Sequence, residues 1–396
     1  MRKLGVSPTT VPVSPVTWTI VAALPGLNAR GALDANHLSI IPVTDPRCAP
    51  ETFDEFARVS RYLRRFRTIK CRPVPSLLMV RRVGTPKPFR NRLTLLRNIL
   101  AISTVVLARA RRSKGKFSRG PTFSDVFDFP AAWLKSGRAG LLVETPVVLG
   151  NDDQSSFCGH PAPAYPYGTN DSYIEWDAPL AGALLALFES RRKDHRHLRR
   201  RVERVLEIAY LALRAPSDNL RSGNDWGVSL ALLVSAFESL ANVAGSVDIE
   251  AVRTLIDGVP WSKRLRRRLA PYEYRSPNRR RSASVFRPLK GMTRPVQIYA
   301  RLYRARNMVL HGEDYERNRL EPGRRNASWG YLQFESAAVF RCVLLHVLAG
   351  HGYGTYLVPP SEREAKRLGL AAALDRHLKA GFHHDPFYES LGCGQD

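Results

Sequence analysis

Between residues 178 and 349, apolar residues recur at steps of three and four with few interruptions. This is the period of an α-helix that buries one face, so the region is expected to form a series of amphipathic helices. The clearest of them is capped by Asn224 or Asp225 and ends at Gly245. Its core stripe consists of Trp226, Leu230, Leu233, Phe237, Leu240 and Ala244. The C-terminal half therefore predicts an all-α helical bundle over residues 177–350.

The first 150 residues have a different pattern, with short runs of β-branched residues. Strands are predicted at 18–24, 38–43, 76–80 and 141–149, and helices at 53–65 and 93–108. This half is expected to be a mixed α/β domain of unknown role, without a Gly-rich phosphate loop, a Gly-x-Ser-x-Gly elbow or a His-Glu-x-x-His motif. The fold class is thus α+β overall. Residues 151–176 are expected to be a linker or long loop, and residues 351–396 a tail with one helix.

The chain is strongly basic, with a formal net charge of +26 over 396 residues. This excess favours an acidic partner such as RNA, since arginine binds phosphate in a bidentate manner. An Arg-rich genome would produce the same excess without any such partner. Five scattered cysteines fit a reduced, cytoplasmic compartment, and no apolar run is long enough to span a membrane.

Two groups of residues contain potential metal ligands. Asp152, Asp153, Cys158 and His160 lie close together in sequence but lack helical spacing or a second ligand pair, which favours a solvated loop. His195 and His197 lie in a basic run, also without partners. We interpret them as solvated or phosphate-facing. No metal or cofactor is expected.

One predicted helix carries a possible reaction site at its end. Pro295 suits its first turn and Gly312 suits the position just after it, and one apolar stripe runs between them. Arg306, Asn307 and His311 lie off that stripe, with Asn307 and His311 one turn apart. A guanidinium, an amide and an imidazole together could bind a phosphodiester. Alternatively, the Arg and the His simply interact with the carbonyl groups and the dipole at the helix end.

The spacing Arg306-Asn307-x-x-x-His311-Gly312 resembles the signature of the HEPN superfamily, and Ile298, Tyr299, Leu302 and Tyr303 before it resemble the Apea-like HEPN branch. The resemblance covers roughly residues 176–350. It implies a helical bundle that forms a homodimer, in which Arg306, Asn307 and His311 of two subunits build a metal-independent ribonuclease site. It also implies a possible role in defence or toxin-like growth control. A regulatory protein partner is possible and not identified.

Glu238 is a candidate supporting residue. Phe237-Glu-Ser-Leu resembles a step of the same family's helices, and Glu238 lies beside the apolar stripe, where a lone carboxylate is costly. It is therefore expected to have a cationic partner, for which Arg306 is the candidate. The alternative is an exposed carboxylate on the flank of the helix.

A basic segment with interleaved aromatic residues precedes the motif helix. Cations for the backbone and flat rings for the bases are what single-stranded RNA binding requires. A solvated loop is the alternative. The candidate RNA-binding residues are Arg266, Arg267, Tyr272, Tyr274, Arg279, Arg280 and Arg281.

These observations predict an endoribonuclease that cleaves single-stranded RNA without a metal. Arg306 would stabilise charge on the phosphate, His311 would transfer protons, and Asn307 would orient either group. The products would carry 2′,3′-cyclic phosphate and 5′-hydroxyl ends. The alternative is a non-catalytic RNA-binding or protein-interaction module with a HEPN fold.

Overall fold

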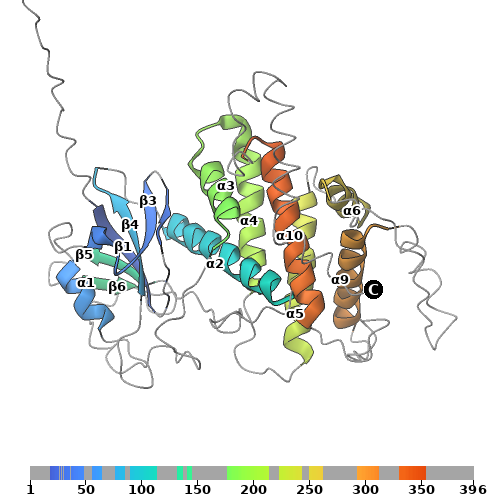
Figure 1. The fold of residues 1–396 in the computed structure, drawn as a ribbon, viewed down its shortest axis with the longest axis horizontal. Helices are drawn as coiled ribbons and strands as arrows, with labels where there is room; N and C mark the ends of the chain where they lie inside the picture. The colour runs from blue at the N-terminus through green and yellow to red at the C-terminus, as the bar shows by residue number, and fades with distance from the viewer. Residues whose placement is uncertain are drawn as a thin grey trace, which may run out of the picture. The chain divides into compact units, whose positions relative to one another are not determined.

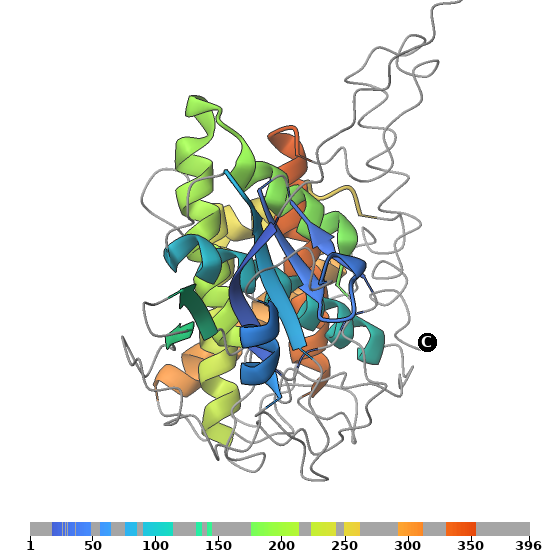
Figure 2. The ribbon, with the colours of Figure 1, turned by 90° about the vertical axis from the view of Figure 1, so that its left-hand side faces the viewer.

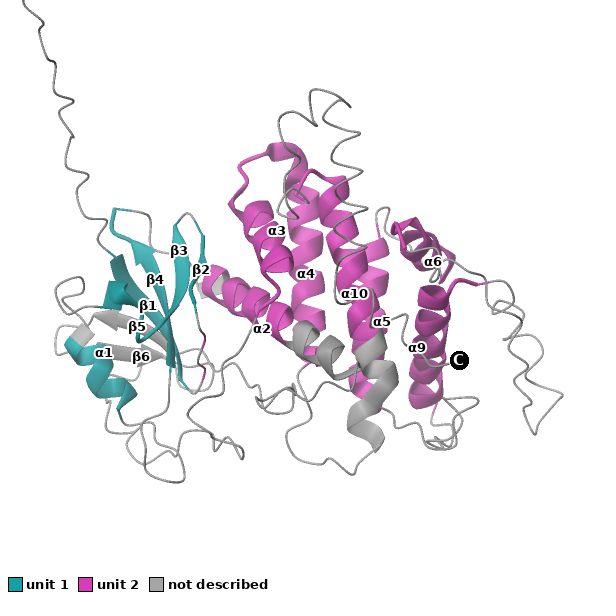
Figure 3. Ribbon diagram, viewed as in Figure 1, with its two compact units in different colours: residues 1–26, 31–88, 131–162 teal, residues 27–30, 89–130, 163–396 magenta. Residues whose placement is uncertain are grey.

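The computed structural model divides the chain into two compact units (Figure 3). Unit 1 comprises residues 1–26, 31–88 and 131–162, and unit 2 comprises residues 27–30, 89–130 and 163–396. The structure describes residues 18–48 without 26, 28, 30 and 36, and residues 56–64, 76–84, 90–113, 132–136, 141–144, 176–213, 223–242, 249–261, 292–311 and 330–353. Within this part of the chain the fold is mixed α and β, as the sequence predicted.

Unit 1 is built on an antiparallel sheet with strand order β2-β3-β4-β1-β5-β6. Strands β1 and β4 pair along most of their length, from Trp18 opposite Arg82 to Pro25 opposite Ser76. The predicted strands at 18–24, 38–43 and 76–80 are all present, whereas β2 and β5 were not predicted. The strands are β1 (Trp18–Pro25), β2 (Leu33–Asp34), β3 (Leu38–Pro42), β4 (Ser76–Arg82), β5 (Ala132–Ser136) and β6 (Leu141–Glu144).

Helix α1 (Phe56–Leu63) packs on one face of this sheet (Figure 2). Its buried residues Val59, Tyr62 and Leu63 join a core cluster with residues of β1 and β4 that alternate along each strand, except at the irregularity between Ile20 and Ala22. Alternation is expected here, because successive strand residues point to opposite faces. The opposite side of α1 carries exposed Arg58 and Arg61, so the helix is strongly amphipathic.

Unit 2 is helical in the part of the chain that the structure describes (Figure 1). Helix α5 lies between α4 and α9, and α10 packs against α2, α3 and α9. The helices are α2 (Arg90–Ser113), α3 (Ala178–Glu189), α4 (Arg196–Leu213), α5 (Gly223–Ala241), α6 (Ile249–Gly258), α9 (Arg294–Leu310) and α10 (Gly330–Gly350).

Helix α10 is the centre of the bundle. Its residues from Ser336 to Leu345 are all buried, including the charged Arg341. Arg341 pairs with Asp177, with 2.5 Å between Nε and Oδ2 and 3.2 Å between Nη2 and Oδ1. Asp177 also caps α3 by accepting from the N–H of Leu180. One carboxylate therefore fixes the start of α3 and compensates a buried guanidinium in α10.

The helix predicted at 93–108 was expected within the domain of residues 1–150, and the structure differs there. It forms part of α2, which packs against α3, α4 and α10 and belongs to unit 2. Its link to α4 includes the Arg97 guanidinium, which lies 4.5 Å from the centre of the Tyr210 ring. Residues 151–175 and the tail from residue 354 lie outside the described residues.

None of the described helices combines the length and the apolar character needed to cross a membrane.

Candidate functional site

Helices α5 and α9 approach closely at Gly227. A methyl group built on Gly227 would lie 2.6 Å from Cγ2 and 2.8 Å from Cγ1 of Val309, so α5 needs glycine at this position. Further along the same contact, the ring of Phe237 packs against Tyr299 of α9 and Phe340 of α10, with ring centres 5.2 Å and 5.4 Å apart. This packing fixes α9, the helix that carries the predicted motif, against its neighbours.

The expected ion pair between Glu238 and Arg306 is present. Nη1 of Arg306 lies 3.4 Å from Oε1 of Glu238, and each side chain is 26% exposed. Side chains lean toward the N-terminus of their own helix, so side chains of neighbouring antiparallel helices can lean toward each other. At 3.4 Å the contact is longer than the usual charge-assisted hydrogen bond of about 2.8 Å. Glu238 therefore positions the guanidinium but leaves N–H donors of Arg306 that could bind another group.

Two tyrosines of α9 lie beside this ion pair. The Arg306 guanidinium stands 5.4 Å from the centre of the Tyr303 ring, one turn earlier, within the range of a cation–π interaction. The hydroxyl of Tyr299 is buried and has no hydrogen-bond partner among the described residues. Burial, and then the nearby negative charge of Glu238, raise the pKa of Tyr299, so this hydroxyl stays protonated.

His311 is exposed at the C-terminal cap of α9. Its backbone N–H donates to the carbonyl oxygen of Asn307 at 3.0 Å, which ends the helix and leaves the imidazole at the surface. Asn307 is half-buried one turn before it. The structure thus places Arg306, Asn307 and His311 in the last turn and cap of one helix, with the charge of Arg306 anchored by α5.

The remaining predicted site residues lie outside the described part of the chain. They are Arg266, Arg267, Tyr272, Tyr274, Arg279, Arg280 and Arg281. Asp152, Asp153, Cys158 and His160 lie outside it as well. Among the residues that the structure does describe, no group of three or more His, Cys, Asp or Glu side chains is arranged to hold a metal ion.

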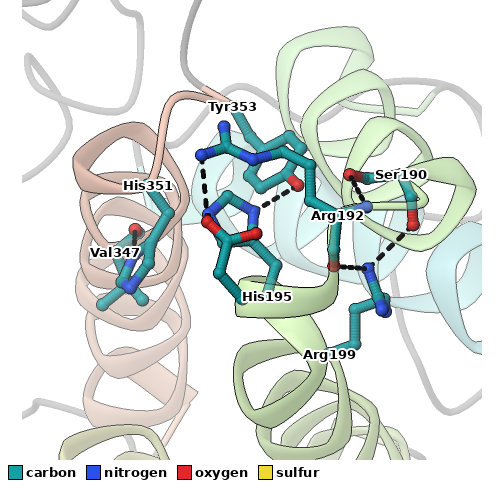
Figure 4. A network of polar contacts seen from close by, with 8 residues as sticks. Ser190, Arg192, His195, Arg199, Val347, His351 and Tyr353 are labelled. Carbon is teal, nitrogen blue, oxygen red and sulfur yellow. Dashed lines mark hydrogen bonds and ion pairs between the residues drawn. The ribbon is translucent and has the colours of Figure 1, made fainter.

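His195 corrects one of our expectations. It was expected to be solvated or phosphate-facing, but only 7% of it is exposed, and its Nδ1 lies 2.6 Å from the hydroxyl of Tyr353 (Figure 4). Its Nε2 lies 3.4 Å from Oδ2 of Asp194. His195 therefore ties the turn before α4 to the end of α10. His197 is exposed, as expected.

Comparison with known proteins gives no relative, because no protein-family model, no curated protein and no solved structure matches the chain.

Sequence reasoning missed two contributors to this site, Gly227 and Tyr303, and it missed the burial of His195 at the turn before α4. The role of Gly227 is visible only once Val309 is known to face it. The Tyr303 contact could have been found, because residues three apart on a helix are neighbours. The anchoring of His195 could not, because Tyr353 is 158 positions away in the chain.

Proposed function

We propose that the end of α9 is the active site of a HEPN-type, metal-independent endoribonuclease that acts on single-stranded RNA. The observation that carries the proposal is the Arg306–Glu238 ion pair. It holds a partly exposed guanidinium in the last turn of a helix whose cap is an exposed histidine. An oriented cation and a group that titrates near neutral pH are what phosphodiester cleavage without a metal requires.

In this mechanism a base removes the proton of the ribose 2′-OH, and O2′ attacks the phosphorus. Arg306 stabilises the added charge on the phosphate oxygens, the bond to O5′ breaks, and an acid protonates O5′. The products carry a 2′,3′-cyclic phosphate and a 5′-hydroxyl, and no water is consumed. His311, exposed at the cap of α9, is the group that we assign to the proton transfer to O5′.

One motif provides one proton-transfer group, whereas the reaction needs an acid and a base. A symmetric homodimer would bring two copies of His311 to one site and supply both. We therefore propose that the enzyme acts as a dimer through the end of its bundle. Val228 of α5 and Leu310 of α9, which are 55% and 60% exposed, are candidates for the contact because they flank Gly227 and Val309.

The second candidate function is a non-catalytic RNA-binding or protein-interaction module with a HEPN fold. The contacts of Arg306 to both Glu238 and Tyr303 favour it, since a purely structural arginine would have the same partners. In that case Arg306 would hold α9 to α5 and would not contact a phosphate.

Cleavage of labelled single-stranded RNA in EDTA separates the two functions. The wild type should cleave, and Arg306→Ala and His311→Ala should each lose cleavage by about a hundredfold or more while remaining folded.

Matched controls exist for both variants. Arg253→Ala removes an arginine of nearly the same exposure that also forms an ion pair, with Glu250, and His37→Ala removes another exposed histidine. Both controls should cleave like the wild type. RNA binding without cleavage by any of the proteins would establish the non-catalytic module instead.

A further inference from the structure

The outer face of α4 carries a row of arginines. Arg196, Arg200 and Arg204 are spaced by four residues and are all exposed. Residues four apart lie on one helical face with a rise of about 6 Å between them, so the three guanidinium groups form a continuous basic stripe. We call these three residues the α4 stripe.

Two other arginines of the same helix turn inward and hold the structure together. Nη1 of Arg199 donates to the carbonyl oxygens of Ser190 and Arg192 at 2.8 Å and 3.0 Å, which closes the turn between α3 and α4. Nη1 of Arg201 reaches the carbonyl oxygen of Asn242 at 3.5 Å, and burial lowers the pKa of Arg201. The helix thus separates structural arginines from the outward-facing α4 stripe.

The turn that leads into the α4 stripe is braced. Figure 4 shows the Arg199 guanidinium reaching the turn's carbonyl groups, and the His195 ring beside the Tyr353 hydroxyl. On its other side, Nε2 of His195 lies 3.4 Å from Oδ2 of Asp194. Arg191 and Lys193 are exposed on this turn and add two more cations. A backbone that is already fixed loses less entropy when a ligand binds. Arg191 and Lys193 are therefore positioned before binding.

The fold does not neutralise the α4 stripe. Among the described residues, none of its three arginines forms an ion pair. Burial, and then repulsion from Glu207, raise the pKa of Glu203 on the same helix, whereas an arginine partner would lower it. Like charges four residues apart destabilise a helix, so an external polyanion would relieve a repulsion built into α4.

We infer that the α4 stripe and the adjoining turn bind the phosphate backbone of an RNA strand. The identification of the polyanion as RNA rests on the proposed function. Helix α5 packs against both α4 and α9. Arg201, within the stretch of α4 that carries the stripe, contacts Asn242 at the end of α5, whereas Val309 faces Gly227 near its start. The stripe therefore lies about 22 Å along α5 from the motif end of α9, in addition to the spacing between the helices. The stripe would hold the strand without regard to sequence, because it contacts phosphates and not bases.

Binding of single-stranded 2′-O-methyl RNA across a salt series tests this inference. This probe lacks the nucleophile of the proposed cleavage, so binding is measured whether or not the protein is a nuclease. The test protein is the full chain with Arg196→Gln, Arg200→Gln and Arg204→Gln, substitutions that preserve helix propensity. The control carries Arg58→Gln, Arg61→Gln and Arg64→Gln, three exposed arginines at and just after α1 in unit 1.

The α4 variant should bind roughly tenfold more weakly, and the slope of log affinity against log salt should become shallower by about 2, while the control binds like the wild type. Equal weakening in both variants would overturn the inference, because the effect would then be one of net charge alone. Absence of RNA binding by the wild type would also overturn the inference. Stripe-dependent binding to anionic phospholipid vesicles without RNA binding would replace it with a membrane surface.

Discussion

Arg306 is the residue on which the account of the site depends. Its guanidinium has a carboxylate on one side and an aromatic ring beneath it, yet 26% of the side chain is exposed. An ion pair of this exposure contributes at most about 1 kcal/mol to stability, so stability alone does not explain it. Orientation of the guanidinium explains it better, since Glu238 limits the positions that the long side chain can adopt.

Glu238→Gln is predicted to change catalysis in a way that a structural role would not. Removal of the charge loosens Arg306 but makes the site more positive. We therefore expect kcat for RNA cleavage to fall about tenfold while KM stays the same or decreases. Steady-state kinetics would measure this split. Glu250→Gln, which breaks the Glu250–Arg253 pair on α6, is the matched control and should leave both constants as in the wild type.

Glu203 is predicted to make stability depend on pH. Its pKa in the folded protein is raised by burial, above its ordinary value of 4.5, so it contributes stability below pH 4.5 that is lost as the pH rises through the folded pKa. Glu203→Gln should therefore raise Tm at neutral pH and have no effect below pH 4.5. Thermal unfolding across this range tests the sign. A lower Tm at neutral pH would mean that the carboxylate has a cationic partner.

The contact between helices α5 and α9 depends on Gly227. On propensity alone, Ala at this helix position would be favoured over Gly by about 1 kcal/mol. The clash with the stiff, β-branched Val309 should outweigh this and make Gly227→Ala destabilising by about 1–3 kcal/mol in chemical unfolding.

Val309→Ala in the same chain should restore part of that loss, because it removes both clashing methyl groups. The double variant should then lose less stability than the sum of the losses of the two single variants. A Gly227→Ala variant that is as stable as the wild type would show that the two helices can move apart.

The link between α3 and α10 is predicted to be the more sensitive one. Asp177→Asn removes the carboxylate from the buried Arg341, whose side chain is 2% exposed, and should cost about 3 kcal/mol in chemical unfolding. Asp34→Asn breaks the contact of an exposed carboxylate with Arg47 and leaves Arg47 paired with Asp45, so it should have no measurable effect. Equal effects of the two variants would contradict the account of the core.

The sequence predicted most elements because their apolar patterns are local. The stripe of α5 and the runs of β1 and β4 each mark an element without reference to the rest of the chain. Strand β5 was not predicted, since its residues Ala132–Ser136 carry no clear alternation and it forms by pairing with β1 and β6. The burial of His195 and Arg341 depends on Tyr353 and Asp177, which are distant in sequence, and no local pattern shows it.

For the candidate site, the sequence predicted the helix, its start near Pro295 and the ion pair between Glu238 and Arg306. The pair was predictable because a carboxylate beside an apolar stripe needs a cation. The sequence could not predict the close approach at Gly227 or the position of the Tyr299 hydroxyl, because both depend on which helices become neighbours.

The arginines that produce the net charge of +26 fall into two groups in the described part of the chain. Some arginines are structural, as Arg199, Arg201 and Arg341 show, and others face outward in an ordered row on α4. The two proposed RNA contacts both lie on unit 2, one at the end of α9 and one along α4.

The most direct test of the central claim is the chemistry of the RNA ends after incubation with the wild-type protein in EDTA. We expect 2′,3′-cyclic phosphate and 5′-hydroxyl ends, and no cleavage at a nucleotide whose 2′-OH is replaced by hydrogen, because O2′ is the nucleophile. Cleavage that leaves 3′-hydroxyl and 5′-phosphate ends, or cleavage that persists at the 2′-deoxy position, would contradict the mechanism.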